Sequence, residues 1–436
     1  MKRYVLSNHE REQKMIVLMY LSAMVGVYFE HIASVALLIF LGVLFWLSIQ
    51  KKDSVELQYS HKAFIGVSVI YGLVLLSSFV IHLPITDDGT WRLSSYSFIL
   101  LLSWMFYVQL KYKMTESMML AALIGSTVFA TIVFIIEFWV FGLALLNDPW
   151  TRLGEFASID FGGYGNFVMA TLIVLVGVAA VQKDTRLIKW LVLAAILLFV
   201  FAVLTKSRTN LLFFPFLFLG YLVFAFQNKL FKLKPMIVKL ALSLGIFAVA
   251  FMAYISTDRI KHAANDIQKL VDNEDYLSSL GLRVLMNKVG AQIVSENPML
   301  GIGLNHFKSA KQEVLSRSEY SQVPQHAKDM TIGFTQIHNQ FLMDMIFIGL
   351  PGLIALLLFI GYPLWFYSKI YFRQRSLANK FLALSGVMFI SYTIFTGLFG
   401  SVFTYTYTSI MYMLVNAMLI SYLSNLPKAK TQPKQV

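Results

Sequence analysis

Apolar runs of about 20 residues, each long enough for an α-helix to cross a hydrocarbon core of about 30 Å, recur along this 436-residue chain. Inside such a core, only helices and closed barrels satisfy their own backbone hydrogen bonds. The composition agrees, since 58% of the residues are hydrophobic and 14% are charged. A water-soluble domain would carry about a quarter charged residues. The sequence therefore predicts an all-α, polytopic integral membrane protein.

Hydropathy predicts twelve transmembrane helices, with the last two divided around Gly397 and Gly400. Their expected bounds are 15–29, 32–50, 63–82, 94–110, 117–145, 164–181, 187–205, 210–226, 237–256, 340–367, 381–399 and 403–423. The first run is too long for a cleavable signal peptide and lacks a small-residue cleavage site, so we interpret it as a span. The expected units are nine helices in 1–256, a large loop at 257–337, three helices in 338–423 and a tail at 424–436.

Lysine and arginine predict the orientation, because positively charged loops stay in the cytoplasm. Of the 36 Lys and Arg residues, 23 fall on the side of the predicted spans that holds both termini. The other side has 13, and nine of them lie in the loop at 257–337 beside nine acidic residues. We therefore expect cytoplasmic termini and an external loop. The net charge of +13 follows from this topology and does not call for a nucleic-acid partner.

Two cations, Lys206 and Arg208, interrupt the apolar sequence in LTKSRTN, residues 204–210, on the predicted outer side. A charge at membrane depth costs several kcal/mol unless it is paired or near water. One interpretation is a short turn whose cations extend to lipid headgroups. The other is an anion site at the membrane rim. Arg208 is the better candidate for an anion site, because a planar guanidinium can grip phosphate through two parallel hydrogen bonds.

The large loop contains GLRVLMNKVGAQIVSENPMLGIGLNHF, residues 281–307, with Arg283 near its start. The spacing of its apolar side chains predicts an amphipathic helix. These side chains are Val284, Leu285, Val289, Ile293 and Val294. Asn297-Pro298 should end the helix, and Gly301 and Gly303 then permit a tight turn or a close backbone approach. Arg283 is either a functional cation or an ordinary solvated arginine on a surface helix.

His338 lies in FTQIHNQFLMD, residues 334–344, where a long polar segment gives way to an apolar run. An imidazole titrates near neutral pH, so it can serve as a general base there. The alternative is a structural histidine at the membrane interface. His306 and His326 lie in the same loop, but neither begins a predicted span.

Several kinds of chemistry have no sequence signal in this chain. The absence of cysteine excludes disulfides, thiol nucleophiles and cysteine metal sites. No GxxxxGK, HExxH or carboxylate cluster is present, so we expect neither a metal nor a cofactor. Acidic residues are nearly absent from the predicted spans, with Glu137 and Asp344 as the main exceptions. This scarcity argues against an ion-coupled pump with a buried proton relay.

Two motifs carry a family resemblance. NPMLGIGLNHF, followed about thirty residues later by HNQFLMDMIFIGLPGL, resembles the O-antigen ligase and polymerase superfamily of bacterial envelopes. The matching positions are Asn297-Pro298, Gly301, Gly303, Phe307, His338-Asn339, Gly349 and Gly352. The resemblance extends over the whole chain in its predicted spans, cytoplasmic ends and single large loop. Two positions depart from it: Thr209 stands where many relatives have glycine, and Met286 where an aromatic residue is common.

The resemblance implies a GT-C-like membrane glycosyltransferase of the bacterial inner membrane that uses no metal or cofactor and acts on the periplasmic face among membrane lipids. It implies a donor glycan on undecaprenyl pyrophosphate and, for a ligase, a lipid A–core sugar as acceptor. Arg208 and Arg283 would hold the pyrophosphate with help from Lys206, and His338 would take the acceptor proton. The residues expected to support the site are Asn339, Gly301 and Gly303.

Other activities fit parts of the pattern. An O-antigen polymerase would use a second lipid-linked repeat as acceptor, and a protein O-oligosaccharyltransferase usually carries an additional large soluble region near its C-terminus. Here the tail after residue 423 is about a dozen polar residues. Because the large loop precedes the His-Asn span in the ligase manner, we favour a ligase. A lipid-linked glycan flippase would need a polar path through several spans, whereas the unusual charges here gather on one face.

Overall fold

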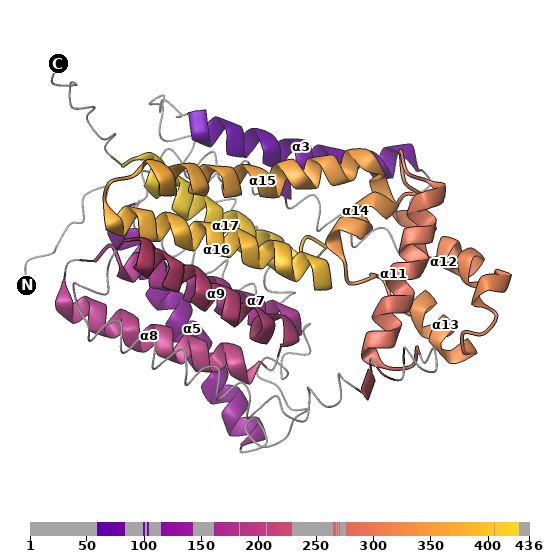
Figure 1. The fold of residues 1–436 in the computed structure, drawn as a ribbon, viewed down its shortest axis with the longest axis horizontal. Helices are drawn as coiled ribbons and strands as arrows, with labels where there is room; N and C mark the ends of the chain where they lie inside the picture. The colour runs from indigo at the N-terminus through magenta and orange to yellow at the C-terminus, as the bar shows by residue number, and fades with distance from the viewer. Residues whose placement is uncertain are drawn as a thin grey trace, which may run out of the picture.

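The computed structural model describes residues 59–82, 99, 100, 103, 115–142, 161–182, 184–205, 207–228, 265, 266, 268, 270, 276–404 and 406–426. The regular elements of this part of the chain are all helices (Figure 1). Six of its helices are long and apolar enough to cross a membrane, which supports a membrane protein. The predicted spans at 15–29, 32–50 and 237–256, and nearly all of 94–110, lie outside the described residues. The total of twelve spans and the domain boundaries therefore stay predictions.

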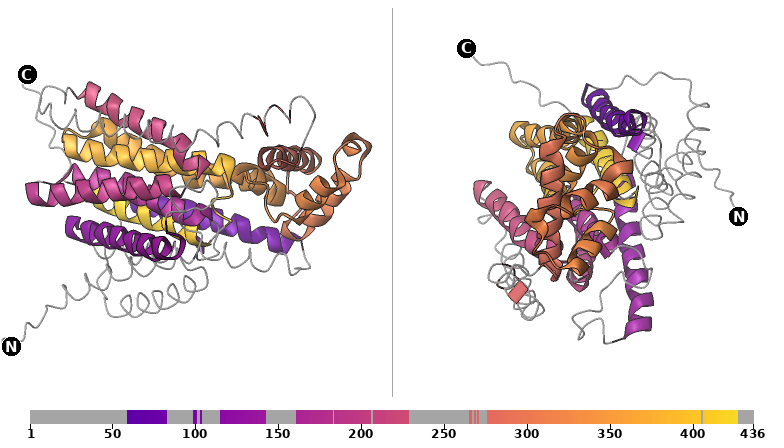
Figure 2. Two further views of the ribbon diagram at one scale, coloured as in Figure 1. Left: turned by 90° about the horizontal axis from the view of Figure 1, so that it is seen from below. Right: turned by 90° about the vertical axis from the view of Figure 1, so that its right-hand side faces the viewer.

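The long helices lie side by side in a bundle (Figures 1 and 2). Its helices are α3 (Tyr59–Ile81), α5 (Glu116–Phe141), α7 (Phe161–Ala179), α8 (Thr185–Leu204), α9 (Arg208–Gln227), α15 (Leu350–Arg373), α16 (Leu377–Phe399) and α17 (Thr406–Ser424). Helix α15 packs between α3 and α16, and α16 in turn contacts α7 and α9. Helices α7 and α8 pack on each other and on α5. The predicted division between 381–399 and 403–423 is confirmed by α16 and α17.

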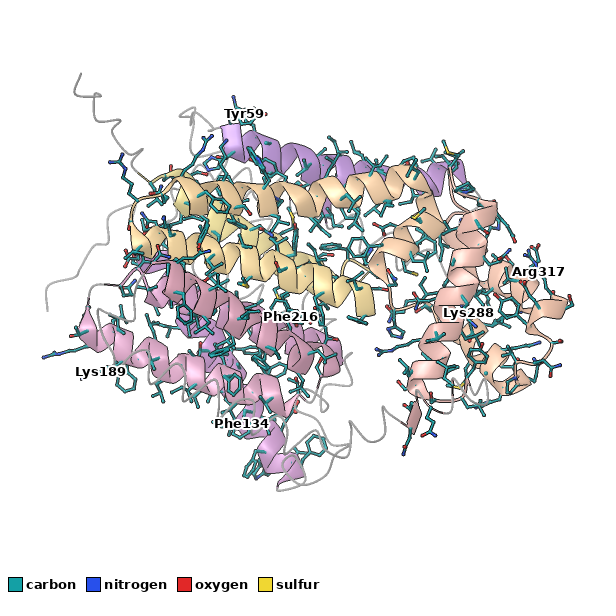
Figure 3. All side chains as sticks on the ribbon, viewed as in Figure 1. Tyr59, Phe134, Lys189, Phe216, Lys288 and Arg317 are labelled. Atoms are coloured by element: carbon teal, nitrogen blue, oxygen red, sulfur yellow. The ribbon has the colours of Figure 1, made fainter. Side chains whose placement is uncertain are left out.

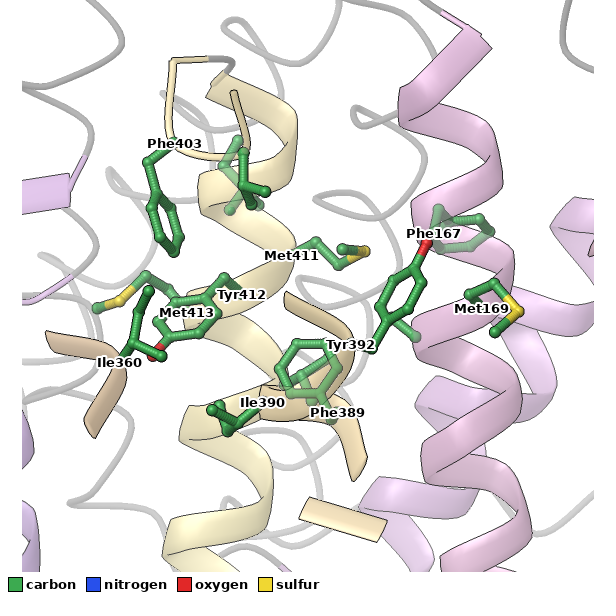
Figure 4. Close-up of a cluster of buried hydrophobic side chains, with 14 of the residues drawn as sticks. Phe167, Met169, Ile360, Phe389, Ile390, Tyr392, Phe403, Met411, Tyr412 and Met413 are labelled. Atoms are coloured by element: carbon green, nitrogen blue, oxygen red, sulfur yellow. The ribbon is translucent and has the colours of Figure 1, made fainter. Parts of the chain in front are cut away.

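Aromatic side chains fill the centre of the bundle. Tyr412 of α17 lies 4.8 Å from Phe359 and 5.0 Å from Phe403, measured between ring centroids. Phe389 of α16 stacks on Tyr412 at 6.1 Å between centroids, and all four rings are buried. Figure 4 shows Phe389, Phe403 and Tyr412 in this cluster. On the outside, Trp139 and Trp190 are largely exposed. Apolar surface of this kind needs a cover, which lipid provides around a membrane protein.

The predicted span 340–367 is wrong as a single helix. It consists of two helices, α14 (Gln340–Ile348) and α15, which meet at Gly349. Gly349 has φ 70°, and a Cβ atom there would lie 2.4 Å from the carbonyl group of Met299. The chain therefore turns sharply at this glycine, although its apolar composition continues. Of the two helices, only α15 is among those able to cross a membrane.

A lobe of shorter helices lies at one end of the bundle (Figures 1 and 2). It contains α11 (Ser279–Glu296), η2 (Leu304–His306), α12 (Phe307–Leu315), η3 (Ser318–Tyr320) and α13 (Gln325–Gly333). Ser278 caps α11 by accepting a hydrogen bond from the backbone N–H of Gly281 at 2.9 Å. The amphipathic helix is confirmed, because Leu285, Val289 and Ile293 are buried and the helix ends at the expected asparagine. Helix α14 packs against α11 and so joins the lobe to the bundle.

Candidate functional site

His338 has an unusual backbone conformation. Among the described residues it is the one non-glycine residue with positive φ, at 55°. A left-handed residue with a side chain costs roughly 1–2 kcal/mol, so its surroundings must hold it in place. The ring of Phe334 lies edge-on to the imidazole at 6.1 Å between centroids. Strained residues of this kind concentrate at functional sites, which makes this turn the candidate centre.

Asn339 links this turn to the helix that follows. Its extended backbone precedes α14, and its side-chain oxygen accepts a hydrogen bond from the N–H of Leu342 at 3.2 Å. Asparagine is a preferred N-cap because it satisfies one of the free N–H groups at a helix start. The cap therefore fixes where α14 begins relative to His338.

Asn287 joins the His338 turn to the helix of Arg283. Its side-chain Nδ2 donates to the carbonyl oxygen of Arg283 at 2.8 Å, one turn earlier in α11. The same nitrogen donates to the carbonyl oxygen of Ile337 at 3.3 Å, and its Oδ1 accepts from Asn339 at 3.3 Å. Both neighbours of His338 are thus held by one amide. The structure brings the backbones of Arg283 and His338, two of the predicted site residues, to the same place.

Lys311 fixes the segment before His338 from the other side. It is 1% exposed, and its Nζ donates to the carbonyl oxygens of Thr331 and Ile332 at 2.8 Å each and to that of Phe334. A cation at these carbonyls also opposes the negative end of α13. The buried lysine thereby holds the backbone of Phe334, whose ring lies against the imidazole of His338.

Helix α14 is tied to the bundle through buried polar groups. Gln340 donates to Asp344 Oδ1 at 2.7 Å and accepts at 2.8 Å from the N–H of Phe403, which lies just before α17. The hydroxyl of Tyr71, from α3, donates to the other oxygen of Asp344 at 2.8 Å. Both oxygens of this carboxyl group are engaged, as burial of a polar group requires. The acidic residue singled out in the sequence therefore anchors the helix that His338 precedes.

The predicted cations at residues 206–208 are described only in part. Arg208 begins α9, but its side chain lies outside the described atoms, as does the whole of Lys206. Below Arg208, Asn210 is fully buried, and its amide lies 2.6 Å from the hydroxyl of Tyr392 and 3.3 Å from that of Thr205. These bonds fix the start of α9 against α16 and the end of α8. A contact between either cation and a pyrophosphate stays a prediction.

Gly301 and Gly303 lie at the other end of α11 from Arg283. With a rise of about 1.5 Å per residue, that separation is about 20 Å along the helix. Both glycines have positive φ, and the turn pairs with the end of α14 through Ile302 N–H to Ile346 O at 2.8 Å. A Cβ on Gly301 would lie 2.6 Å from that backbone. The observed role of these glycines is close backbone approach, and their expected role with phosphate stays a prediction.

The most informative contacts come from residues that the sequence did not single out. Asn287 lies four residues after Arg283, the spacing that places two side chains on one helix face. That spacing was the available signal. Lys311 and Tyr392 had none, because each gains its role from partners distant in sequence. Within the described part of the chain, no three His, Asp or Glu residues are grouped so that they could hold a metal ion.

Comparison with known proteins bears on the same region. A family model described as O-antigen ligase matches residues 193–357, which include α9, α11, α14 and the turn of His338. A protein of Haemophilus influenzae described as uncharacterized is 25% identical over 179 residues. That alignment covers 40% of this chain and 42% of the relative, so the chain spans well under two thirds of the relative's length.

Proposed function

We propose that this chain is an O-antigen ligase, because a family model described as O-antigen ligase matches residues 193–357. The donor is a glycan on undecaprenyl pyrophosphate, and the acceptor is a hydroxyl of a lipid A–core sugar. Transfer takes place en bloc on the periplasmic face of the inner membrane, with both termini in the cytoplasm. Members of the matched family are glycosyltransferase-like enzymes, so the assignment of a glycosyltransferase-like activity rests on the family match alone.

The bond changes follow from the donor. The acceptor oxygen attacks the anomeric carbon while the bond from that carbon to the pyrophosphate oxygen breaks. The pyrophosphate lipid leaves with the electron pair, and attack from the opposite face inverts the anomeric centre. His338 takes the proton of the acceptor hydroxyl, because a histidine can accept a proton near neutral pH. A positioned base of this kind contributes roughly 10²- to 10⁴-fold to a rate.

The arginines act on the leaving group. Negative charge grows on the pyrophosphate as the bond breaks, and fixed cations stabilise that charge without reorganising. Arg283 and Arg208 supply those cations, and each guanidinium can form two parallel hydrogen bonds to phosphate. Lys206 adds a point charge beside them. No metal takes part in this scheme, because the arginines neutralise the charge that a divalent ion would otherwise offset.

One observation supports the proposal most directly, namely the bridge made by Asn287. A transfer site needs its base and its anion-binding group in one place, held within a fraction of an ångström. The amide of Asn287 bonds to the backbone of Arg283 and to both neighbours of His338. The bridge joins residues 50 positions apart, so it fixes the helix of Arg283 against the turn of His338 as a transfer site requires.

The location of the site also suits lipid substrates. His338 lies where the lobe meets the bundle, next to a short helix that joins the two. Both donor and acceptor are amphiphiles, so their glycans must reach water while their acyl or prenyl chains stay in lipid. A junction between membrane helices and a polar lobe meets both conditions.

The test begins with lipopolysaccharide from a deletion strain, resolved on a gel, with the undecaprenyl-linked pool analysed in parallel. A core without O-antigen, with long glycan accumulating on the lipid carrier, supports the ligase. A core capped by one repeat indicates the polymerase instead. An unchanged ladder rejects both. Complementation with His338→Ala should fail, whereas Ser295→Ala, an exposed change on α11, should restore the wild-type ladder.

A further inference from the structure

A polar cavity lies in the lobe, away from the His338 turn. Its volume is about 400 Å³, within the range of small-molecule sites. Its polar wall is formed by His82 at the end of α3, Glu296 at the end of α11, and His306, Ser309 and Glu313 around α12. The imidazoles of His82 and His306 stand edge-on with centroids 6.4 Å apart. None of these side chains has a part in the transfer chemistry.

The walls of this cavity are fixed by backbone contacts. Gly303 has φ 73°, and a Cβ there would lie 2.5 Å from the imidazole of His82. Only glycine lets the turn lie this close to that ring. Asn305 donates from its side chain to the carbonyl oxygen of His82 at 3.0 Å, and the N–H of Gly303 donates to the carbonyl oxygen of Phe347 at 3.1 Å. The cavity is therefore built by the same glycine turn that the sequence singles out.

The acidic side of the cavity is held by Arg317, which lies at the outer edge of the lobe (Figure 3). Its guanidinium bridges Glu296 through both nitrogens and reaches Glu313 at 3.3 Å. Two carboxylates and one guanidinium leave one negative charge on this wall. That charge repels a phosphate or pyrophosphate. Glu313 accepts from Arg317 through one oxygen, so its other oxygen can accept a hydrogen bond from a ligand.

We infer that this cavity binds one neutral sugar unit of the glycan substrate, remote from the bond being formed. Carboxylate, hydroxyl and imidazole groups bind the hydroxyls of a sugar, and Ile293, Ile302 and Val314 offer apolar surface to its carbon face. The cavity lies about 20 Å along α11 from Arg283, so its sugar is not the one that reacts. The inference rests on the proposed function, because it assumes a substrate with several sugars.

The lining chemistry selects a sugar over other small ligands. An anion is disfavoured by the negative wall. A divalent cation would need a third ligand beside the two imidazoles, and no such group of three is present among the described residues. A purely apolar ligand would cover the charged carboxylate of Glu313 and displace its water, which costs free energy.

The experiment uses the full-length protein in lipid nanodiscs and saturation-transfer NMR. The probes are methyl galactoside, methyl glucoside and methyl N-acetylglucosaminide, with inorganic pyrophosphate as the anionic comparison. Ser309→Trp and Ala310→Trp each place a large ring in the cavity, and Gln312→Trp adds the same ring at an exposed site of α12 outside it. The first two should abolish transfer of saturation to at least one glycoside, while Gln312→Trp should leave it unchanged.

Binding to none of the three glycosides, or equal binding by all three tryptophan variants, would overturn the inference. Failure of Ala310→Trp to fold leaves Ser309→Trp as the deciding variant, since Ser309 is exposed and tolerates a larger side chain. His338→Ala separates the cavity from the proposed function. If that variant loses transfer but still binds glycoside, both ideas stand. In the wild-type protein, glycan transfer without glycoside binding rejects only the cavity, and glycoside binding without transfer rejects only the ligase.

Discussion

Asn287 accepts a hydrogen bond from Asn339 at 3.3 Å, and this contact joins the helix of Arg283 to the turn of His338. Through its Nδ2, Asn287 also donates to the backbone carbonyl of Arg283 and to that of Ile337, the residue before His338. One amide therefore holds the backbone of the proposed anion-binding residue against the turn that carries the proposed base. The predictions about activity follow from that arrangement.

The first prediction concerns Asn287→Ala. Each lost hydrogen bond is worth about 1 kcal/mol, and a base displaced from its place loses about tenfold in rate for each 1.4 kcal/mol. We expect transfer by purified protein to fall about tenfold or more in kcat, with KM for the lipid-linked donor nearly unchanged. Ser295→Ala on the same helix is the control and should keep wild-type kinetics. A rise in KM alone would show that Asn287 serves binding and not the placement of His338.

The second prediction uses the positive φ of His338. Glycine adopts φ 55° without strain, so His338→Gly should be more stable than His338→Ala by about 1 kcal/mol. Both variants should lose at least about 100-fold in transfer rate, because the base is absent from each. Added imidazole should restore part of the activity to the glycine variant. His326→Ala, an exposed histidine of α13, should change neither melting temperature nor rate. Equal stability of the two His338 variants would contradict the strain argument.

The third prediction concerns the buried lysine. Lys311→Met keeps the length of the side chain but leaves the carbonyls of Thr331, Ile332 and Phe334 without their donor. Loss of a charged donor to buried groups should cost about 3 kcal/mol. Hydrogen exchange should therefore accelerate at 325–334, and transfer should fall because Phe334 no longer supports His338. Lys308→Met, on the exposed face of α12, is the matched control. Equal hydrogen exchange in both variants would contradict the idea that Lys311 holds this segment.

Hydropathy predicted the bundle well and its interruptions poorly. Predicted spans correspond to α3, α5, α8, α9 and α16, because length and apolar content decide whether a helix can cross lipid. The break at Gly349 was missed because 340–367 is apolar on both sides of it. A turn depends on backbone φ and on the neighbour that comes close, here Met299, and neither quantity enters hydropathy.

The site was predictable as a set of separate residues and not as an arrangement. Charge at an unexpected position marked Arg208, and family motifs marked Arg283 and His338. What holds two of them together is Asn287, an ordinary polar residue within an amphipathic helix. Its partner Ile337 is 50 positions away, so no local pattern reveals the contact. Lys311 was counted among the loop cations, although in the fold it is buried.

The fourth prediction is a pH dependence in the lobe. Hydrogen bonding to Arg317, followed by that to Gln292, lowers the pKa of Glu296 from 4.5 to about 2. A carboxyl group whose pKa is lowered in the folded state stabilises the fold at pH values above its ordinary pKa. That stabilisation disappears as the pH falls through the lowered pKa of the folded state. Wild-type protein should therefore resist unfolding of the lobe better than Glu296→Gln at pH 6. The difference should shrink between pH 4.5 and 2, as measured by pulsed hydrogen exchange over 279–317. A difference that persists unchanged at pH 2 would contradict the ion pair as its source.

The last prediction compares two glycines of the same region. Gly349 has φ 70°, and a Cβ there would lie 2.4 Å from the backbone of Met299, which cannot move without breaking the turn. Gly361 lies inside α15, and a Cβ there would meet nothing within 4 Å. Gly349→Ala should therefore reduce the yield of folded protein sharply. Gly361→Ala should be neutral or stabilise by up to about 1 kcal/mol, because alanine favours a helix.

The Gly349→Ala variant also tests whether Gly349 affects only folding or the rate of transfer as well. Gly349 follows α14, the helix that begins at Asn339, so misplacing its end should also shift the turn of His338. We expect the residual folded Gly349→Ala protein to transfer glycan more slowly per molecule, measured after removal of aggregate by size exclusion. If the folded fraction keeps the wild-type rate, Gly349 acts only in folding, and the position of His338 is set by Asn287 and Lys311 alone.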